Sequence, residues 1–446
     1  MGAHGHCDPR FARVREVFEG HFAQGEEIGA AFAVHLDGEP VVDLWDGVAD
    51  RHTGRPWERD TPALSYSCTK AVTAAVVLML AERGAVDLGA PVAEVWPEFA
   101  AGGKERVTVE HLLTHQAGLP VIEHDVPVEE FEDQPAIAAR LAGQTPMWEP
   151  GTAHGYHALT YGFLVGEVVR RVTGKSVGEI VATEIAGPRG LDLWLGAPPD
   201  VIARAARLSA GERTNPASER TAPSGGASAN GPGDRTEATA TGTGTGTGTG
   251  GAGTSGGADA GAERHEGGSG RTVGELTGRG PGDPVWEMAR ASLDRGSLMS
   301  RAMANPSPAK LKGGANHPVI MRAGWPAMGL VTTARGLAGF YRDLLAGEII
   351  GAATLEDALR PRVSGPDRVM FVDSSFGLGF MRPAMMFLTP PKGAGAFGHP
   401  GLGGFAGLGD PRHGLAVAYT MNKMANAVAG SMRGHRLIES VYDSLL

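Results

Sequence analysis

Ser67 and Lys70 are the two side chains whose types and spacing point most directly to chemistry. They stand three residues apart, just before an apolar run over 72–83 that Gly84 ends. Alanine, leucine and methionine favour a helix, and a glycine after such a run is typical of a helix end. Positions three apart share a helical face, so the hydroxyl and the ammonium should lie side by side. A hydroxyl nucleophile needs such a neighbouring base, although the pattern also fits a serine near a helix start with a solvated lysine.

Charge and cysteine content narrow the classes of partner. The chain of 446 residues has a formal net charge of -10, which argues against nucleic acid or an anionic membrane surface as partner. Its two cysteines, Cys7 and Cys68, predict no disulfide framework, and Cys68 is interpreted as a small buried side chain. Neither a signal peptide nor an apolar stretch of membrane-spanning length is visible, so a cytoplasmic location is predicted.

The histidines offer one spacing that suits a metal. His111 and His115 stand four apart in a short predicted helix, but no glutamate follows His111 and no third ligand is apparent. Ordinary polar packing is therefore preferred, and we expect no metal and no other cofactor. His154 and His157 flank Tyr156 and could contact a substrate, but exposure on a loop is the preferred interpretation.

The segments around these residues predict strands toward both ends of the chain and helices between them. Residues 28–35 and 40–45 form a hairpin through Asp37-Gly38, and Asp46-Gly47 ends the second strand. The other predicted strands lie at 375–380, 395–399 and 415–421. Predicted helices lie at 9–24, 135–141, 161–173, 176–185, 285–293, 334–345 and about 425–445. We expect an α+β fold with one antiparallel sheet built from N- and C-terminal segments, flanked by helices and carrying a helical insertion subdomain.

Residues 209–271 differ sharply in composition from the rest of the chain. They include a Thr-Gly repeat over 241–250 and have almost nothing apolar to bury, so they are predicted to be disordered. Gly253-Thr-Ser-Gly-Gly257 matches a G-x-S-x-G pattern there, but a nucleophile elbow needs a strand before it and a helix after it. The remainder is assigned to one domain, 1–208 and 272–446, with a sheet part at about 1–75 and 325–446 and a helical part at about 76–320.

Four stretches together resemble a known family. Ser67-Cys-Thr-Lys70 matches its first motif, and the others are His111-Leu-Leu-Thr-His-Gln-Ala-Gly-Leu119, Glu149-Pro-Gly-Thr-Ala-His-Gly-Tyr156 and Phe397-Gly-His-Pro-Gly-Leu-Gly-Gly404. They resemble a helix and loop, the run into a catalytic tyrosine, and the strand with the third motif. Outside residues 209–271, the chain is similar to the serine β-lactamase and penicillin-binding-protein superfamily. Within it, the class C β-lactamase-related hydrolases and esterases are the most similar branch.

The resemblance implies a role for each matching residue. Ser67 would be the acylated nucleophile, and Lys70 and Tyr156 would share the role of base. For the tyrosine this requires a pKa lowered from about 10, which a nearby lysine cation would provide. The oxyanion hole would use the backbone N–H groups of Ser67 and Leu402.

Two departures from the family pattern concern recognition. The second motif commonly reads Tyr-x-Asn, whereas Ala158 stands here in place of the asparagine. The third commonly reads Lys-Thr-Gly, whereas this chain has His399-Pro400-Gly401, in which the proline removes a strand donor. A histidine supplies less positive charge than a lysine for a substrate carboxylate at neutral pH. His399 and Gly401 are predicted to bind substrate, and a carboxylic ester is the predicted substrate.

These observations favour a serine hydrolase that forms an acyl-Ser67 intermediate, with a small-molecule ester or amide as its partner. The alternatives are a β-lactamase or D-amino-acid peptidase, an acyltransferase to an alcohol or amine, and a non-catalytic binding or assembly module. Retention of Ser67, Lys70 and Tyr156 together argues against the non-catalytic module. No pattern predicts an oligomeric state.

Overall fold

The computed structural model describes residues 2–210, 280–385, 388–425 and 430–445. Most of the predicted insertion, with its Thr-Gly repeat, lies outside these residues. The prediction that it is disordered concerns those residues and stays a prediction. Ser209 belongs to the described domain, because its N–H donates to the Asn422 carbonyl at 2.7 Å and it forms a parallel bridge with Lys423. The packed part of the chain therefore reaches beyond residue 208.

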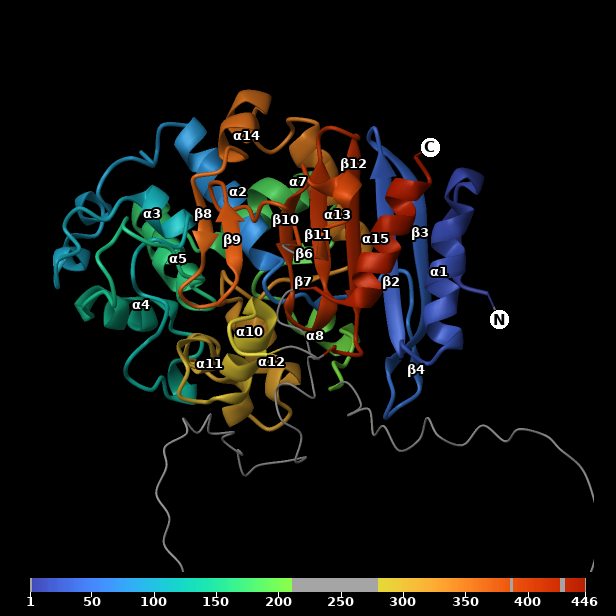
Figure 1. The fold of residues 1–446 in the computed structure, drawn as a ribbon, viewed down its shortest axis with the longest axis horizontal. Coiled ribbons are helices and arrows are strands. Elements are labelled where there is room, and N and C mark those ends of the chain that lie inside the picture. The colour runs from blue at the N-terminus through green and yellow to red at the C-terminus, as the bar shows by residue number, and fades with distance from the viewer. Residues whose placement is uncertain (1, 211–279, 386–387, 426–429, 446) are drawn as a thin grey trace, which may run out of the picture.

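The main sheet joins the two ends of the chain, as predicted. In the described residues it has seven strands in the order β1-β3-β2-β12-β11-β10, with β4 paired to β3, and neighbours run antiparallel. The N-terminal strand β2 and the C-terminal strand β12 pair at its centre (Figure 1). The strands are β1 His4–Cys7, β2 Gly29–Leu36, β3 Glu39–Asp50, β4 Arg55–Pro56, β10 Phe397–Pro400, β11 Ala406–Asp410 and β12 Leu415–Met421.

The hairpin between β2 and β3 confirms one local prediction and corrects another. Asp37 and Gly38 have φ values of 50° and 88°, as a tight turn matched to strand twist requires. The prediction that Asp46-Gly47 ends the second strand is wrong, because β3 continues to Asp50. A Cβ on Gly47 would lie 2.1 Å from the Ile28 carbonyl oxygen, so this glycine permits close strand approach and does not stop the strand.

Residues 375–380 do not form the predicted strand of the main sheet. Strand β9, Asp373–Phe376, pairs instead with β8, Val363–Pro366, in a separate two-stranded sheet. A third small sheet contains β5 Ala63–Leu64, β6 Leu193–Trp194 and β7 Val331–Thr332. Short strands paired far from their sequence neighbours leave little signal in the sequence, since their alternation spans too few residues.

Helices cover both faces of the main sheet (Figure 1). Helices α1, Ala12–Ala23, and α15, Met432–Asp443, pack against each other, whereas α13, Ala334–Leu345, packs on β2, β11 and β12. Helix α15 begins later than predicted, where the Ser431 side chain accepts the Gly434 N–H and caps it. Besides α2, the described ranges contain the α-helices α3 Val109–Leu113, α4 Gln134–Gly143, α5 Thr160–Thr173, α6 Val177–Ile180, α7 Gly187–Arg189, α8 Pro199–Arg204, α10 Pro284–Leu293, α11 Leu298–Ala304, α12 Pro318–Ala323 and α14 Ala352–Ala358.

Helix α2, Thr69–Glu82, runs through the interior and brings Ser67 to the edge of the sheet. It is buried over residues 69–80 and contacts α5 on one side and β10 on another. Because the helix is enclosed on all sides, apolar residues surround it and its sequence shows only a weak amphipathic pattern. The strand leading into it is held by Ser65, whose N–H and hydroxyl both donate to the Leu330 carbonyl, at 2.8 and 3.0 Å.

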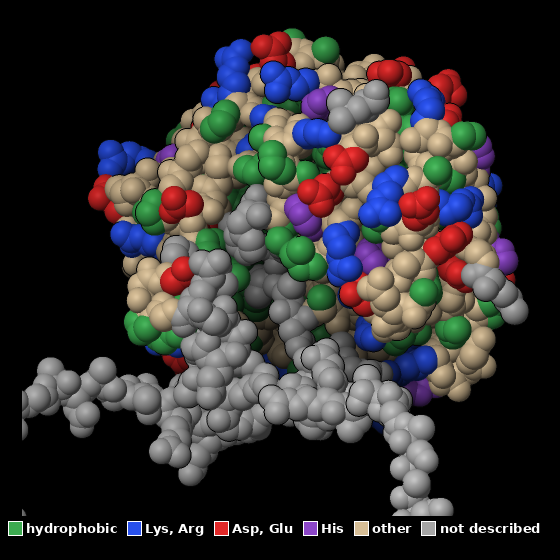
Figure 2. Space-filling view, turned by 45° about the vertical axis from the view of Figure 1, so that its right-hand side comes forward, with side chains coloured by type: hydrophobic (Ala, Val, Ile, Leu, Met, Phe, Trp, Pro, Cys, Tyr) green, Lys and Arg blue, Asp and Glu red, His purple; other side chains and the backbone are tan. Residues whose placement is uncertain are grey.

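The surface shows no field of a single charge on the face that Figure 2 presents. Basic and acidic side chains alternate over its described right-hand part. No helix in the described ranges is long and apolar enough to cross a membrane.

Candidate active site

The first turn of α2 places Ser67 and Lys70 side by side, as their spacing predicts. Ser67 is partly exposed in the turn just before the helix, whereas Lys70 is fully buried. Lys70 Nζ lies 3.2 Å from Ser67 Oγ and donates to the carbonyl oxygens of Ala158 and Ala327, at 2.8 and 3.1 Å. Tyr66 adopts a φ of 48°, a conformation costly for a bulky residue, in the turn that presents the serine.

Tyr156 completes a three-residue cluster around the serine oxygen. Its O–H donates to Ser67 Oγ at 2.9 Å, and its ring centroid lies 4.7 Å from Lys70 Nζ. Phe376 and His399 stack on the ring at centroid distances of 6.3 and 5.6 Å. Residues 67, 70 and 156, expected to act together, therefore meet at one point.

Burial sets the proton positions in this cluster. It holds the pKa of Lys70 well below the ordinary lysine value of 10.5, which favours the neutral amine. Burial also raises the pKa of Tyr156, and the negative charge of Asp367 adds to that rise. The prediction that a lysine cation lowers the tyrosine pKa is therefore wrong, because the desolvated lysine favours its uncharged form. The phenol therefore keeps its proton, and the neutral amine has a lone pair that can accept one.

His399 is a neutral ring beside the cluster. Burial lowers the pKa of His399 to about 3. Its Nδ1 lies 2.8 Å from the Pro400 carbonyl oxygen, which can only accept, so Nδ1 carries the proton. Nε2 is then a lone-pair acceptor, and it is buried without a hydrogen-bond partner among the described residues.

The histidines on the tyrosine loop are buried, which corrects the expectation of an exposed loop. His154 is 5% and His157 1% exposed. His157 Nε2 accepts the Leu119 N–H at 3.0 Å, and the His157 N–H donates to His115 Nδ1 at 3.1 Å. These bonds tie the loop of residues 115–119 to the tyrosine segment.

His111 and His115 do not form a metal pair. Helix α3 ends at Leu113, so the two side chains do not share a helical face. The His111 ring accepts the Thr108 N–H in a capping box, and His115 receives the bond described above. Within the described ranges, no group of three or more His, Cys, Asp or Glu side chains is placed to hold a metal ion.

Strand β10 docks its third-motif residues against the serine turn. A Cβ on Gly401 would lie 2.3 Å from the Ser65 carbonyl oxygen, so only glycine allows this approach. The Cys68 thiol is buried and donates to the His399 carbonyl at 3.3 Å, in keeping with its interpretation as a small buried side chain. Leu402 directly follows Gly401, and the role of its N–H in an oxyanion hole stays a prediction.

Three groups that contact the cluster were not predicted from the sequence. The carbonyls of Ala158 and Ala327 hold Lys70, and Phe376 stacks on the tyrosine. Backbone carbonyls cannot be selected by residue type. Phe376 was assigned to a strand of the main sheet and not to the site.

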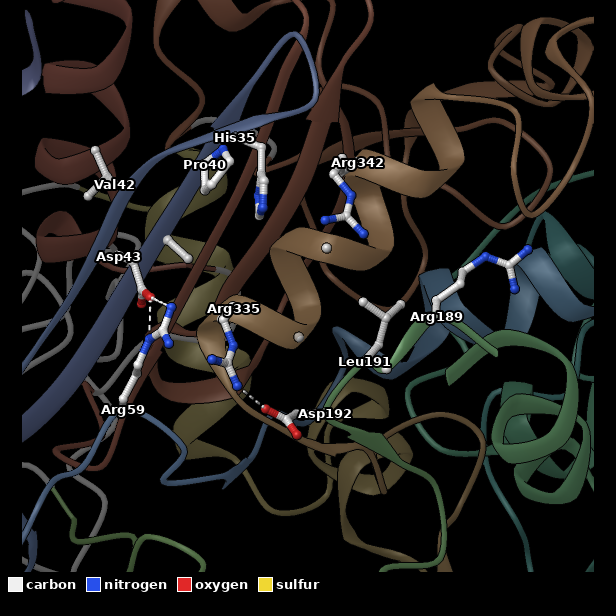
Figure 3. A pocket seen from close by; sticks show the side chains of 14 residues that line it. His35, Pro40, Val42, Asp43, Arg59, Arg189, Leu191, Asp192, Arg335 and Arg342 are labelled. Atoms are coloured by element: carbon white, nitrogen blue, oxygen red, sulfur yellow. Dashed lines mark hydrogen bonds and ion pairs between the residues drawn. The ribbon is translucent and has the colours of Figure 1, made fainter. Parts of the chain in front are cut away.

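A pocket away from the Ser67 cluster lies between α13, β2 and β3, toward the end of the sheet opposite β10 (Figure 3). Its volume is about 240 Å³, and it is lined by His35 and four arginines, Arg59, Arg189, Arg335 and Arg342. Three of the guanidinium groups bind carboxylates: Arg59 binds Asp43, Arg335 binds Asp192 and Arg342 binds Asp343. The fourth, Arg189, donates to backbone carbonyls of residues 184, 185 and 348, and its Nε lies 3.8 Å from Asp343 Oδ2. Because these bonds satisfy much of the charge, we call this the arginine pocket and do not regard it as the active site.

Comparisons with known proteins identify the family and the fold of this chain. The family model described as Beta-lactamase matches residues 14–441. The esterase/beta-lactamase LipL of Mycobacterium tuberculosis (strain ATCC 25618 / H37Rv) is 32% identical over 450 residues, which cover 98% of this chain and 86% of that protein. A family VIII carboxylesterase structure has a TM-score of 0.76 and 32% identity, with both chains covered completely. A penicillin-binding protein homolog from Caulobacter crescentus has a TM-score of 0.74 and 32% identity, again over the whole of both chains.

Proposed function

The chain belongs to the β-lactamase family and is a serine hydrolase, and we propose that it acts as a carboxylesterase on small, uncharged esters. The observation that carries the ester assignment is the neutral, acceptor-bearing His399 at the third motif. The proposed catalytic residues are Ser67, Lys70 and Tyr156, with the N–H groups of Ser67 and Leu402 as the oxyanion hole.

The bonds around Lys70 suit an amine that removes the serine proton. A neutral amine has two N–H bonds and one lone pair, and a carbonyl oxygen can only accept. Assigning the two N–H bonds to Ala158 and Ala327 leaves the lone pair facing Ser67 Oγ, 3.2 Å away. In the acylation step, Ser67 Oγ attacks the ester carbonyl, its proton passes to Lys70 Nζ, and the carbonyl electrons move onto the oxyanion.

Tyr156 suits the role of proton donor to the leaving group. Its phenol stays protonated and lies 2.9 Å from the oxygen that attacks. When the tetrahedral intermediate collapses, the leaving alkoxide takes the phenol proton, and the Lys70 ammonium restores it, so both groups regain their starting state. Water then attacks the acyl-enzyme and gives a proton to the Lys70 amine. As this second tetrahedral intermediate collapses, the acid leaves and Ser67 Oγ takes the proton back from the Lys70 ammonium, 3.2 Å away, so both groups return to their starting state.

His399 argues for substrates without a carboxylate near the third motif. Its lone pair at Nε2 is an acceptor, and a substrate carboxylate offers only acceptors of its own. Two such groups would face each other in a site of low dielectric, which is unfavourable. A neutral ester avoids this conflict.

Hydrolysis of p-nitrophenyl acetate by the full chain tests the proposal. We expect turnover and labelling by a fluorophosphonate in the wild type, and a loss of about 10³-fold or more in kcat/KM in Ser67→Ala. Equal turnover and labelling of the two proteins would contradict Ser67 as nucleophile.

The substrate assignment is tested by a charge change at the third motif. We expect a chromogenic cephalosporin, which carries a carboxylate, to be a poor substrate of the wild type and a better one of His399→Lys, whose ammonium attracts that group. Rapid turnover of the cephalosporin or of a D-amino-acid amide by the wild type would favour the β-lactamase or peptidase alternatives. Ester formation from an added alcohol would favour the acyltransferase. Cytoplasmic location stays a prediction, for which cell fractionation is the test.

A further inference from the structure

Asp367 is a buried carboxylate that holds the backbone of the tyrosine loop. It is 3% exposed and lies at the end of β8, far in sequence from Tyr156. Its Oδ1 accepts three backbone N–H groups, from Tyr156 at 3.0 Å, Val369 at 2.8 Å and Met370 at 2.9 Å. A carboxylate with several N–H partners is a strong and directional anchor, because charge-assisted bonds are shorter and stronger than neutral ones.

The other oxygen of Asp367 binds a serine and, through it, a histidine. Ser374 O–H donates to Asp367 Oδ2 at 2.9 Å, and Ser374 Oγ lies 2.9 Å from His154 Nε2. These residue types match a hydrolytic triad, but in a triad the acid orients the histidine and the histidine faces the serine. Here the serine stands in the middle, and its proton is committed to the carboxylate. The group is therefore a support and not a second nucleophile.

The turn between β8 and β9 meets the tyrosine loop at a second point. The Arg368 N–H donates to the His154 carbonyl at 3.2 Å. A Cβ on Gly155 would lie 2.9 Å from the Trp148 ring and 3.1 to 3.2 Å from the Val369 and Arg368 side chains. Glycine at 155 therefore permits the close contact that the Asp367 bond needs.

We propose that Asp367 is a positioning residue that fixes the Tyr156 backbone so that the phenol reaches Ser67 Oγ. This inference rests on the proposed function, in which that phenol supplies the leaving-group proton. Without the Oδ1 anchor, the tyrosine loop keeps its stacking partners but loses the bond nearest its own Cα. Proton transfer is sensitive to such displacements, since about 1 Å of misplacement can cost about 10²-fold in rate.

Steady-state kinetics with a small alkyl ester, whose alkoxide leaving group needs the phenol proton, test this role on full-length variants. Asp367→Ala should lower kcat about 100-fold with KM within about threefold, since it disturbs the chemistry and not the binding of the ester. Asp367→Asn keeps a carbonyl oxygen that can accept the three N–H groups, so it should recover most of the lost kcat, to within about fivefold of wild type. Asp373→Ala, an exposed aspartate of the same hairpin, is the matched control and should stay within about twofold.

If Asp367→Ala does not fold, a substitution in the tyrosine loop itself tests the same contact between that loop and the turn after β8. Gly155→Ala should push the two loops apart and lower kcat about tenfold, again with little change in KM. A folded Asp367→Ala with the kcat of Asp373→Ala would overturn the inference. So would an Asp367→Asn as slow as Asp367→Ala, because the retained oxygen would then have no effect.

Fluorophosphonate labelling separates the two proposals. If wild type labels at Ser67 and Asp367→Ala hydrolyses the alkyl ester as fast as Asp373→Ala, only the role of Asp367 fails. If wild type does not label and Ser67→Ala still hydrolyses the ester, the proposed function itself fails.

Discussion

Titratable side chains gather at two places in the described molecule, and their charges are removed in opposite ways. Around Ser67, burial drives Lys70 and His399 toward their neutral forms without a carboxylate partner. In the arginine pocket, the cations keep their charge, and carboxylates such as Asp43 and Asp192 compensate it. A desolvated base without a counter-ion can take a proton, whereas a paired guanidinium cannot. Clustered charge alone therefore does not identify a reactive site.

The largest effect expected from this contrast is on catalysis. Lys70→Arg keeps a positive side chain but removes the neutral amine, since a guanidinium stays protonated in proteins. We expect kcat/KM for p-nitrophenyl acetate to fall about 10³-fold. Arg342→Gln in the arginine pocket is the control, with an expected change of about twofold or less. Appreciable activity in Lys70→Arg would mean that position 70 acts through its charge and not as a base.

A smaller effect is expected on the pH dependence of the free energy of unfolding, and a histidine in each region should contribute to it. Burial lowers the pKa of His157, beside the site, and of His35, in the arginine pocket, to about 4. Each ring is neutral when folded and titrates near 6.5 when unfolded, so its contribution is present above pH 6.5 and is lost as the pH falls toward 4. At pH 5 the loss is about 2 kcal/mol for each ring, relative to neutral pH.

Denaturant unfolding at pH 7.5 and pH 5 measures this loss. His157→Gln and His35→Gln should each weaken the pH dependence by about 2 kcal/mol. Only His157→Gln should also lower esterase activity, because His35 lies away from the serine. A pH dependence equal to that of wild type in either variant would show that the ring is not held neutral in the folded protein.

The smallest effect is expected at the rim of the arginine pocket. The Arg59–Asp43 pair joins an arginine side chain that is 54% exposed to a carboxylate, at 2.7 Å. Such exposed pairs contribute about 0.5 kcal/mol and are screened by salt. Arg59→Ala should therefore lower the free energy of unfolding by about that amount, and the difference should shrink in 1 M NaCl. A loss several times larger would contradict the small contribution expected of an exposed ion pair.

The sequence by itself determined that Ser67 and Lys70, the proposed nucleophile and base, lie next to each other. Ser67 and Lys70 meet because helical spacing places residues three apart together, which needs no information from the rest of the chain. The Asp37-Gly38 turn, the helix that follows Lys70 and the strands toward both chain ends followed from equally local or repeating patterns. The family motifs then indicated Tyr156 and the His399 strand.

Only the tertiary structure decided how these groups are charged and held. The tyrosine pKa rises where a fall was predicted, because burial depends on everything packed around the ring. The tyrosine loop is buried and anchored by Asp367, whose partner Tyr156 stands 211 residues away in the chain. Neither desolvation nor a side-chain bond to a distant backbone N–H leaves a periodic trace in the sequence, so both emerge only when the chain is folded.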